Sequence, residues 1–283
     1  MKEPRPVQAA EQELGEDGIA KLERFIVQAA EAYRNEGIPV ADDGRIDNRA
    51  YANLYFDEIQ EDNDRTAEYE AEWLGAVSDE EKKKERRKKE GEQLEMLSFA
   101  IFTKNLPRDE FVVVRSSSHD DRVNKVDTLI LDRKTGTLVC AFDEVGATNG
   151  KEYDDKLALV HDLNLTKGGA SLKYGISSKM EDGKQTVALS SAENIPVFYI
   201  ALPSKNIKEG MEKFLPDMAN QSEYEQGLFS YFVLTISAQI EILELNGRRL
   251  NPALREKLTA FKSIMEPIQA GIKKSQAAKK KGK

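Results

Sequence analysis

The sequence predicts an α/β fold in which a mixed β-sheet of about six strands is flanked by helices. Three observations support this fold class. Apolar residues recur at helical spacing before residue 106, strand-like apolar runs gather between residues 111 and 203, and long helical patterns return after residue 206. Strands and helices in such an order are typical of an α/β layout. We therefore expect a sheet-containing core with an N-terminal helical region and C-terminal helices.

The first part of the chain is expected to be helical after a flexible start. Residues 1–17 are polar and are expected to form a flexible N-terminus. Within a helical region of residues 18–78, one helix is predicted over 18–35, and one or two more over 48–75. The loop between them contains Pro39 and Gly44, which interrupt regular structure.

Residues 79–270 are expected to form the α/β core and the C-terminal helices. A long helix is predicted to open at Asp79 and to end before Pro107, and its first half is almost wholly charged. HDDRVN is predicted to be a turn or bulge, and KEYDDKLALVHDLNL an amphipathic helix. The six predicted strands are FVVVR, VDTLILD, TLVCAFDEV, SLKYGIS, QTVALSS and VFYIALP.

The second and third predicted strands should form an antiparallel hairpin. The short loop DRKTG joins them, with Gly136 placed for a positive φ angle. Both faces of LVCAF are apolar, which predicts a central strand that is covered on both sides. After the last strand come the helical patterns IKEGMEKFL, EQGLFSYFVLTISAQIEILEL and PALREKLTAFKSIMEPI. Residues 271–283 are rich in lysine and are expected to be a disordered basic tail.

Composition excludes several kinds of site. Cys140 is the only cysteine, so an internal disulfide and a thiolate metal cage are excluded. His119 and His161 are the only histidines, so a site with many histidine ligands is excluded as well. No run approaches the roughly 20 apolar residues that span a bilayer, and the N-terminus has no apolar signal region. We therefore expect a cytoplasmic protein without a membrane segment.

The net charge of −8 is divided unevenly along the chain. Residues 1–80 contain 8 Lys/Arg and 21 Asp/Glu, a net charge of −13, and the remainder therefore carries +5. An acidic first part argues against nonspecific coating of DNA by the whole surface. The more basic remainder leaves room for a site that faces phosphate groups.

Two predicted neighbouring strands each carry an aspartate at one end. Asp127 lies near the start of VDTLIL, and Asp143 lies near the end of LVCAFDEV. Folding the hairpin about DRKTG brings Asp127 toward Asp143. Two like charges in a partly buried place cost several kcal/mol unless something neutralises them, and Mg²⁺ or Mn²⁺ prefers carboxylate oxygens. The pair therefore predicts a metal site that would suit phosphodiester hydrolysis.

The arrangement of elements around these aspartates resembles the core of the PD-(D/E)XK nuclease superfamily, the restriction-endonuclease-like fold. The resemblance covers roughly residues 90–203, in the order helix, three strands, helix, strand. It implies that Asp127 is the first acid of the site and Asp143 the second. It also implies a helix acid, for which Glu92 and Glu95 in GEQLEMLSF are the candidates. The implied activity is that of a Mg²⁺-dependent nuclease, a hydrolase acting on nucleic acid.

The sequence departs from the pattern of that family at the lysine. The family lysine should follow Asp143 by two residues, where Val145 stands, and valine can neither position nor deprotonate an attacking water. A lysine from elsewhere could take its place. The candidates are Lys125, Lys167 and Lys173.

Other interpretations of these residues stay open. Asp143 and Glu144 could simply enter solvent at the end of their strand, and Asp127 could cap a turn after RVNK. Asp121, beside an expected Asx-type turn, could add an acid to the site. The run KKKERRKK could bind nucleic acid, although such a run is more often a solvated helix face.

The sequence thus leaves two functions from different classes. One is a metal-dependent phosphodiesterase acting on nucleic acid, either fully active or catalytically weakened. The other is a non-catalytic interaction or regulatory module on a degenerate nuclease fold, in which the acidic N-terminal helices bind a protein partner.

Overall fold

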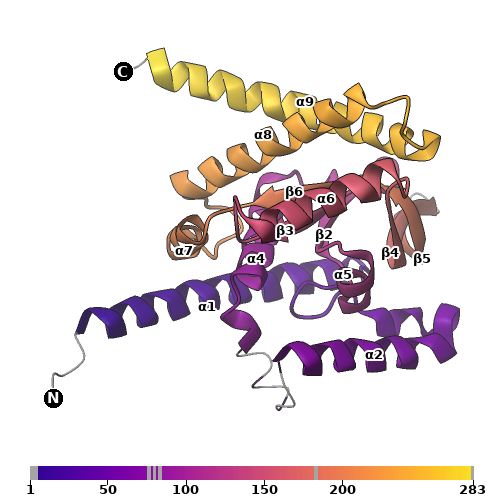
Figure 1. Ribbon diagram of the computed structural model, residues 1–283, viewed down its shortest axis with the longest axis horizontal. Coiled ribbons are helices and arrows are strands. Elements are labelled where there is room, and N and C mark those ends of the chain that lie inside the picture. The colour runs from indigo at the N-terminus through magenta and orange to yellow at the C-terminus, as the bar shows by residue number, and fades with distance from the viewer. Residues whose placement is uncertain (1–5, 75–77, 79–80, 82–84, 182–183, 282–283) are drawn as a thin grey trace.

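The computed structural model describes the backbone of residues 6–74, 78, 81, 85–181 and 184–281. Figure 1 shows three levels, with helices α8 and α9 on one side, the strands and α6 in the middle, and α1 and α2 on the other side. The helices are α1 (Pro6–Asn35), η1 (Asn48–Tyr51), α2 (Ala52–Leu74), α4 (Glu90–Asn105), α5 (Ser118–Asn124), α6 (Lys151–Leu165), α7 (Ser204–Lys213), α8 (Glu223–Leu245) and α9 (Pro252–Lys281).

The strands form two sheets, and the predicted α/β fold class is confirmed. The larger sheet has the order β1-β2-β3-β6, in which β1, β2 and β3 are antiparallel neighbours and β6 is parallel to β3. The smaller sheet is the antiparallel pair β4-β5. The six predicted strands are therefore present in the described residues, but they are divided four and two. Their bounds are β1 (Phe111–Arg115), β2 (Thr128–Asp132), β3 (Thr137–Val145), β4 (Ala170–Glu181), β5 (Lys184–Ile195) and β6 (Val197–Ala201).

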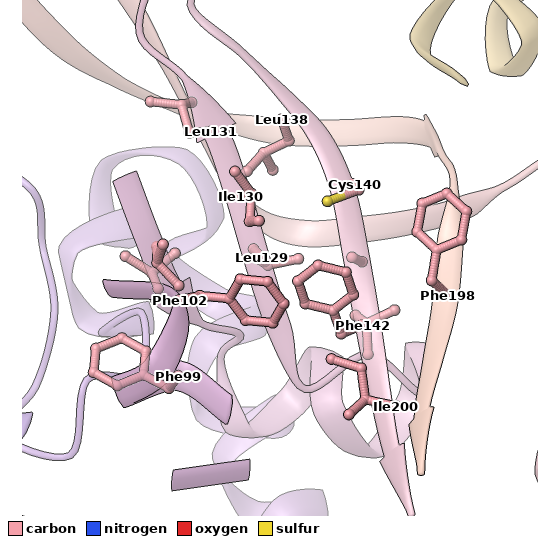
Figure 2. Packing of buried hydrophobic residues seen from close by; sticks show 14 of the residues in the cluster. Phe99, Phe102, Leu129, Ile130, Leu131, Leu138, Cys140, Phe142, Phe198 and Ile200 are labelled. Carbon is pink, nitrogen blue, oxygen red and sulfur yellow. The ribbon is translucent and has the colours of Figure 1, made fainter. Parts of the chain in front are cut away.

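The β3 strand is the centre of the core, as its apolar sequence predicts. Every residue of β3 after Thr137 is buried. On one face the ring of Phe142 stacks on Phe102 of α4, with the ring centroids 4.8 Å apart (Figure 2). Because Glu95 lies seven residues before Phe102, about two helical turns, this packing also directs an acid of α4 toward the strand ends.

Several elements differ from their predicted bounds. Helices α1 and α9 extend into segments 1–17 and 271–283, where we expected no regular structure. The predicted long helix before Pro107 is interrupted at Lys88–Lys89, so α4 begins only at Glu90, while Asp79 lies outside the described residues. HDDRVN forms the short helix α5 because the Ser117 side chain caps its first turn by accepting a hydrogen bond from Asp120 N.

The N-terminal and C-terminal helices both pack on the sheet-containing core. Phe25 of α1 meets Phe214, which follows α7, edge to face at 5.3 Å, and the Tyr33 hydroxyl accepts a hydrogen bond from Val113 N of β1. Helix α8 is long and apolar enough to cross a membrane by length and composition alone. Half of its apolar stretch is buried, with Phe232 and Ile236 in the core, whereas Ile242 and Leu245 are 55% and 88% exposed. One face of α8 therefore belongs to the core.

Candidate active site

A cleft of about 1020 Å³ opens where the ends of β2 and β3 meet the first turns of α4 and α6 and the short helix α5. Its described lining contains nine carboxylate side chains and six cationic ones. The lining therefore has a formal excess of negative charge, which opposes a polyanion such as nucleic acid unless cations or protons offset it.

The hairpin register places Asp127 beside the end of β3. Thr128 pairs with Phe142, so Asp127 and Asp143 are the next residues along the two strands. Lys125 ends α5 with a left-handed φ of 58°, which turns the chain into β2. The Asp127 backbone N–H donates to Phe142 O at 2.8 Å, and its carboxylate accepts from Glu144 N at 2.8 Å. Asp127 is therefore held firmly against the third strand.

The two acids of β3 are buried at the floor of the cleft. Asp143 is 1% exposed and Glu144 is 5% exposed. The alternative in which Asp143 enters solvent is therefore wrong. Lys156 of α6 forms an ion pair with Asp143 Oδ1, while Glu144 Oε1 accepts hydrogen bonds from Ser98 and Thr128. The second oxygen of each acid, Asp143 Oδ2 and Glu144 Oε2, is buried without a hydrogen-bond partner among the described atoms.

The acids of α4 face two buried arginines. Arg115 at the end of β1 donates to Glu92 and to Glu95, both at 2.6 Å. Arg45, from the loop after α1, donates to Glu95 at 2.9 Å and to Asp121 at 2.8 Å. Loop, strand and two helices thus meet through charge-assisted hydrogen bonds, which fix the α4 acids in place.

Three acids from three elements could hold a metal ion. One carboxylate oxygen from each of Glu95, Asp121 and Asp127 lies within 4.8 Å of the other two. Two oxygens that share an ion with metal–oxygen distances of about 2.1 Å lie at most about 4.2 Å apart, so small side-chain shifts would complete such a site. The unpartnered oxygen of Asp143 supplies a further acceptor in the same cleft. The three carboxylates could therefore hold a divalent cation, which would share Glu95 and Asp121 with their arginine partners.

Burial and mutual repulsion raise the pKa of several of these acids. Burial, followed by the charges of Glu95 and Asp143, holds the pKa of Asp127 well above its usual range. Burial, with Glu92 and Asp121, raises the pKa of Glu95 to about 8. Burial opposes ionisation of Glu92 too, but the guanidiniums of Arg115 and Arg45 outweigh it and lower its pKa to about 2. The cluster thus has more negative charge than its own arginines neutralise.

The acids of β3 show the same excess of negative charge. Burial raises the pKa of Asp143, and the nearby ammonium of Lys156 only partly offsets this. Burial also raises the pKa of Glu144 in spite of the hydrogen bond from Ser98. At Lys156 burial opposes the charged form, but Asp143 and Asp127 together raise its pKa. Lys156 is therefore a firmly charged ammonium within the acid cluster.

The structure brings together some of the predicted site residues and separates others. Asp127, Asp143, Glu92, Glu95 and Lys125 all line the cleft. Lys173 and Lys167 are the two that lie elsewhere, and the structure does not support them as substitutes for the motif lysine. The Lys173 ammonium binds Asp62 at 2.6 Å and Glu58 at 2.7 Å, and Lys167 pairs with Asp162 at 3.3 Å.

Sequence reasoning missed Lys156, and it missed the role of the two arginines. Lys156 stands six residues into a helix that follows β3 after only five residues, 146–150. So short a connection brings the first turns of α6 back beside the end of β3. The length of this connection therefore favours a lysine of α6 itself, rather than one that follows α6, as the substitute for the motif lysine. Arg45 lies 50 residues before Glu95, and no local spacing links the two.

The residues with other reactive groups lie outside this cluster. The His119 ring nitrogen Nδ1 is 3.4 Å from Asp62, away from the lining of the cleft. Cys140 is fully buried in β3, and burial holds the pKa of its thiol well above the ordinary value. It packs as a small apolar residue.

Comparisons with known proteins do not assign this chain to a family. No protein-family model matches the chain, and neither the curated proteins nor the solved structures contain a match. What the fold and the cleft define is a mixed α/β protein with a cleft in which Glu95, Asp121 and Asp127 could hold a metal ion and Lys156 pairs with Asp143.

Proposed function

We propose that the protein is a metal-dependent phosphodiesterase acting on nucleic acid, built like the PD-(D/E)XK nucleases. The observation that carries the proposal is that Asp127 just before β2, Asp143 of β3 and Lys156 of α6 meet in one cleft. The helix acid Glu95 joins them, as the resemblance implies. The element order α4-β1-β2-β3-α6-β6, interrupted by α5 after β1 and by the β4-β5 pair after α6, with β6 parallel to β3, supports the same proposal.

Each side chain has a task in this proposal. Asp127, with Glu95 and Asp121, would hold a Mg²⁺ or Mn²⁺ ion, and Asp143 would supply a further oxygen. Such an ion stabilises negative charge on phosphoryl oxygens and makes a bound water more acidic. Lys156, placed by its ion pair with Asp143, would orient the attacking water from the side of α6. It would thus do from the helix what the motif lysine does from the strand, where this chain has Val145.

Cation binding and cleavage test the proposal separately. Isothermal titration with Mn²⁺ should give a binding signal that Asp127→Asn and Asp143→Ala abolish. Labelled single- and double-stranded DNA and RNA should be cleaved with Mg²⁺ or Mn²⁺ and left intact with EDTA. Lys156→Met should lower the cleavage rate by roughly 100-fold or more, the scale of a lost acid–base or positioning group. Lys167→Met is the matched control, because Lys167 lies just after α6 and its side chain is 58% exposed. This variant should cleave normally.

The ion pairs of the cleft favour a second candidate function. Lys156 already neutralises Asp143, and Arg45 and Arg115 already bind the α4 acids, so part of the cluster is a closed structural network. In this case the chain is a non-catalytic regulatory module, with acidic α2 as the surface for a protein partner. Cation binding without cleavage of any of the four nucleic acids would support this candidate, and absence of both would contradict the metal site.

A further inference from the structure

Two arginines at the cleft converge on one carboxylate oxygen. Arg86 and Arg122 both donate to Oε1 of Glu70 on α2, and the distance from Arg122 is 2.5 Å. Arg122 also donates to Thr66 O of α2 at 2.7 Å. Their side chains are only 21% and 17% exposed, and both line the cleft. A planar guanidinium pair around a single anionic oxygen is the geometry with which proteins bind a phosphate group.

This pair lies directly beside the candidate metal centre. Arg122 follows Asp121, one of the three acids that could hold the ion, on the same short helix. Residues 85–87 are helical and precede the start of α4, which carries Glu92 and Glu95. The arginine pair and the three acids line one cleft, so a single strand could contact both.

An exposed aromatic side chain lines the same cleft as the arginine pair. Tyr69 precedes Glu70 on α2, lines the same cleft and is 56% exposed. Val123, which follows Arg122 on α5, is 53% exposed and also lines the cleft. Exposed aromatic rings beside cationic side chains are the usual platform for unpaired bases, because every base can stack on a ring while its phosphate is bound alongside.

We infer that Arg86, Arg122 and Tyr69 form a nucleotide subsite for single-stranded nucleic acid, with the phosphate on the two guanidiniums and the base on the Tyr69 ring. In the free protein Glu70 occupies the phosphate position, so α2 inhibits binding until a strand displaces this carboxylate. A duplex does not satisfy the subsite, because its bases are already stacked on one another. The inference rests on the proposed function for its substrate class, but it concerns binding and does not require cleavage.

Equilibrium binding tests the subsite independently of catalysis. We would measure the fluorescence anisotropy of a labelled single-stranded oligonucleotide and of a hairpin duplex of equal charge, in Ca²⁺ to offset the acidic cleft, with strand integrity checked on a gel. The single strand should bind more tightly. Tyr69→Ala should weaken that binding roughly five- to hundredfold, the usual range for a lost stacking contact, and Tyr69→Phe should not. Phe56→Ala is the control, since Phe56 is 79% exposed on the same helix but outside the cleft lining.

The arginines and Glu70 give two further readouts. Arg122→Ala should weaken binding and reduce the slope of log Kd against log salt by about 0.7, one phosphate contact to a single strand. Glu70→Gln should tighten binding, because the competing carboxylate is gone. Glu61→Gln removes the same charge from the exposed side of α2, where Glu61 pairs with Arg65, and should have little effect.

The outcomes separate the subsite from general charge effects. Equal affinity for single strand and duplex would overturn the inference, as would Tyr69→Ala or Arg122→Ala with wild-type affinity and a wild-type melting temperature. Equal gains from Glu70→Gln and Glu61→Gln would show that only the net charge of α2 matters, which also overturns the displaced-carboxylate mechanism. Binding that follows the expected pattern without any cleavage would support the subsite while contradicting the proposed catalysis.

Discussion

At the scale of single residues, the buried acids of the cleft lower the free energy of unfolding of the protein. Asp127, Asp143 and Glu144 are buried, and two of their oxygens have no hydrogen-bond partner among the described atoms. A buried anion without a partner costs free energy that a hydrophobic or neutral side chain would not. Proteins commonly accept such a cost where a site needs it.

Asp127→Asn should therefore stabilise the cation-free protein while removing its response to cations. The asparagine oxygen can still accept from Glu144 N, but the repulsion with Glu95 and Asp143 disappears. We expect a gain of about 1–3 kcal/mol in the free energy of unfolding, or a melting temperature higher by roughly 2–5 °C, for the variant in EDTA. Mg²⁺ or Mn²⁺ should raise the melting temperature of the wild-type protein but not that of the variant.

A buried aspartate outside the cluster provides the control for this prediction. Asp132, at the other end of β2, accepts from Lys134 N at 2.9 Å and from Thr135 at 2.8 Å. Asp132→Asn weakens these bonds without relieving repulsion, so it should lower the melting temperature and keep the cation response. A cation response that survives Asp127→Asn would place the ion elsewhere.

The site residues that sequence could predict are those that local periodicity controls. Strand alternation and a hairpin turn are enough to bring Asp127 and Asp143 together, and helical spacing puts Glu92 and Glu95 on one face. Lys156 depends instead on how α6 lies over β3, which is a tertiary relation. Arg45 comes from a loop whose position is set by packing against distant elements, so no spacing in the sequence reveals it.

At the scale of elements, apolar periodicity predicted the strands and most helices, and competing local interactions explain the differences. The Ser117 cap turned an expected turn into α5, and the charged run before α4 did not sustain one long helix through Lys88–Lys89. The division into two sheets could not be predicted, because strand alternation tells which residues share a face but not which strands are neighbours. The β4-β5 pair thus appears as an insertion between α6 and β6.

The turn between β2 and β3 provides a test at this scale. Gly136 has a φ of +69°, and a Cβ atom there would lie 1.9 Å from Ser178 O of β4. Its carbonyl also accepts from Ser178 N at 2.8 Å, so the hairpin turn and β4 are joined. An alanine in a left-handed conformation costs roughly 1–2 kcal/mol. Gly136→Ala should lower the free energy of unfolding by more than this, because β4 must also move away from the added Cβ atom.

Gly37→Ala separates strain from collision. Gly37, at the end of α1, has a φ of +82°, and a Cβ atom added there would meet nothing within 4 Å beyond its chain neighbours, so this variant carries the backbone cost alone. Chemical denaturation of both variants should show the larger loss at Gly136. Equal losses of unfolding free energy in the two variants would mean that an alanine at position 136 does not collide with β4.

At the scale of the whole molecule, one apolar core joins the N-terminal helices, the sheet and the C-terminal helices. Leu22 of α1, Phe142 of β3 and Phe261 of α9 belong to the same buried cluster. The acidic first part of the chain is thus packed on the core, and its charge borders the cleft through α2. We expect the described part of the chain to unfold as one cooperative unit, in which far-UV circular dichroism and tyrosine fluorescence give coincident transitions.

A buried ion pair at the junction of these parts provides the test. Lys104 of α4 and Glu225 of α8 pair with both side chains 0% exposed, and Lys104 lies over the ring of Phe214 at 4.7 Å. Glu225→Gln leaves the buried ammonium without its counter-charge, which should cost about 3–5 kcal/mol. Glu244→Gln, which breaks the partly exposed pair of α8 with Lys262, should cost less than about 1 kcal/mol.

The shape of the unfolding transition of Glu225→Gln distinguishes a chain that unfolds as one unit from one made of separately unfolding parts. Because the Lys104 ammonium contacts residues from three parts of the chain, its destabilisation should shift the whole transition to lower temperature without splitting it. Lys104→Met combined with Glu225→Gln should recover much of the loss, since no charge is then left buried. A variant that unfolds in two steps, with only the second step at the wild-type temperature, would instead mean that α8 and α9 form a unit that separates from the sheet before the rest of the core unfolds.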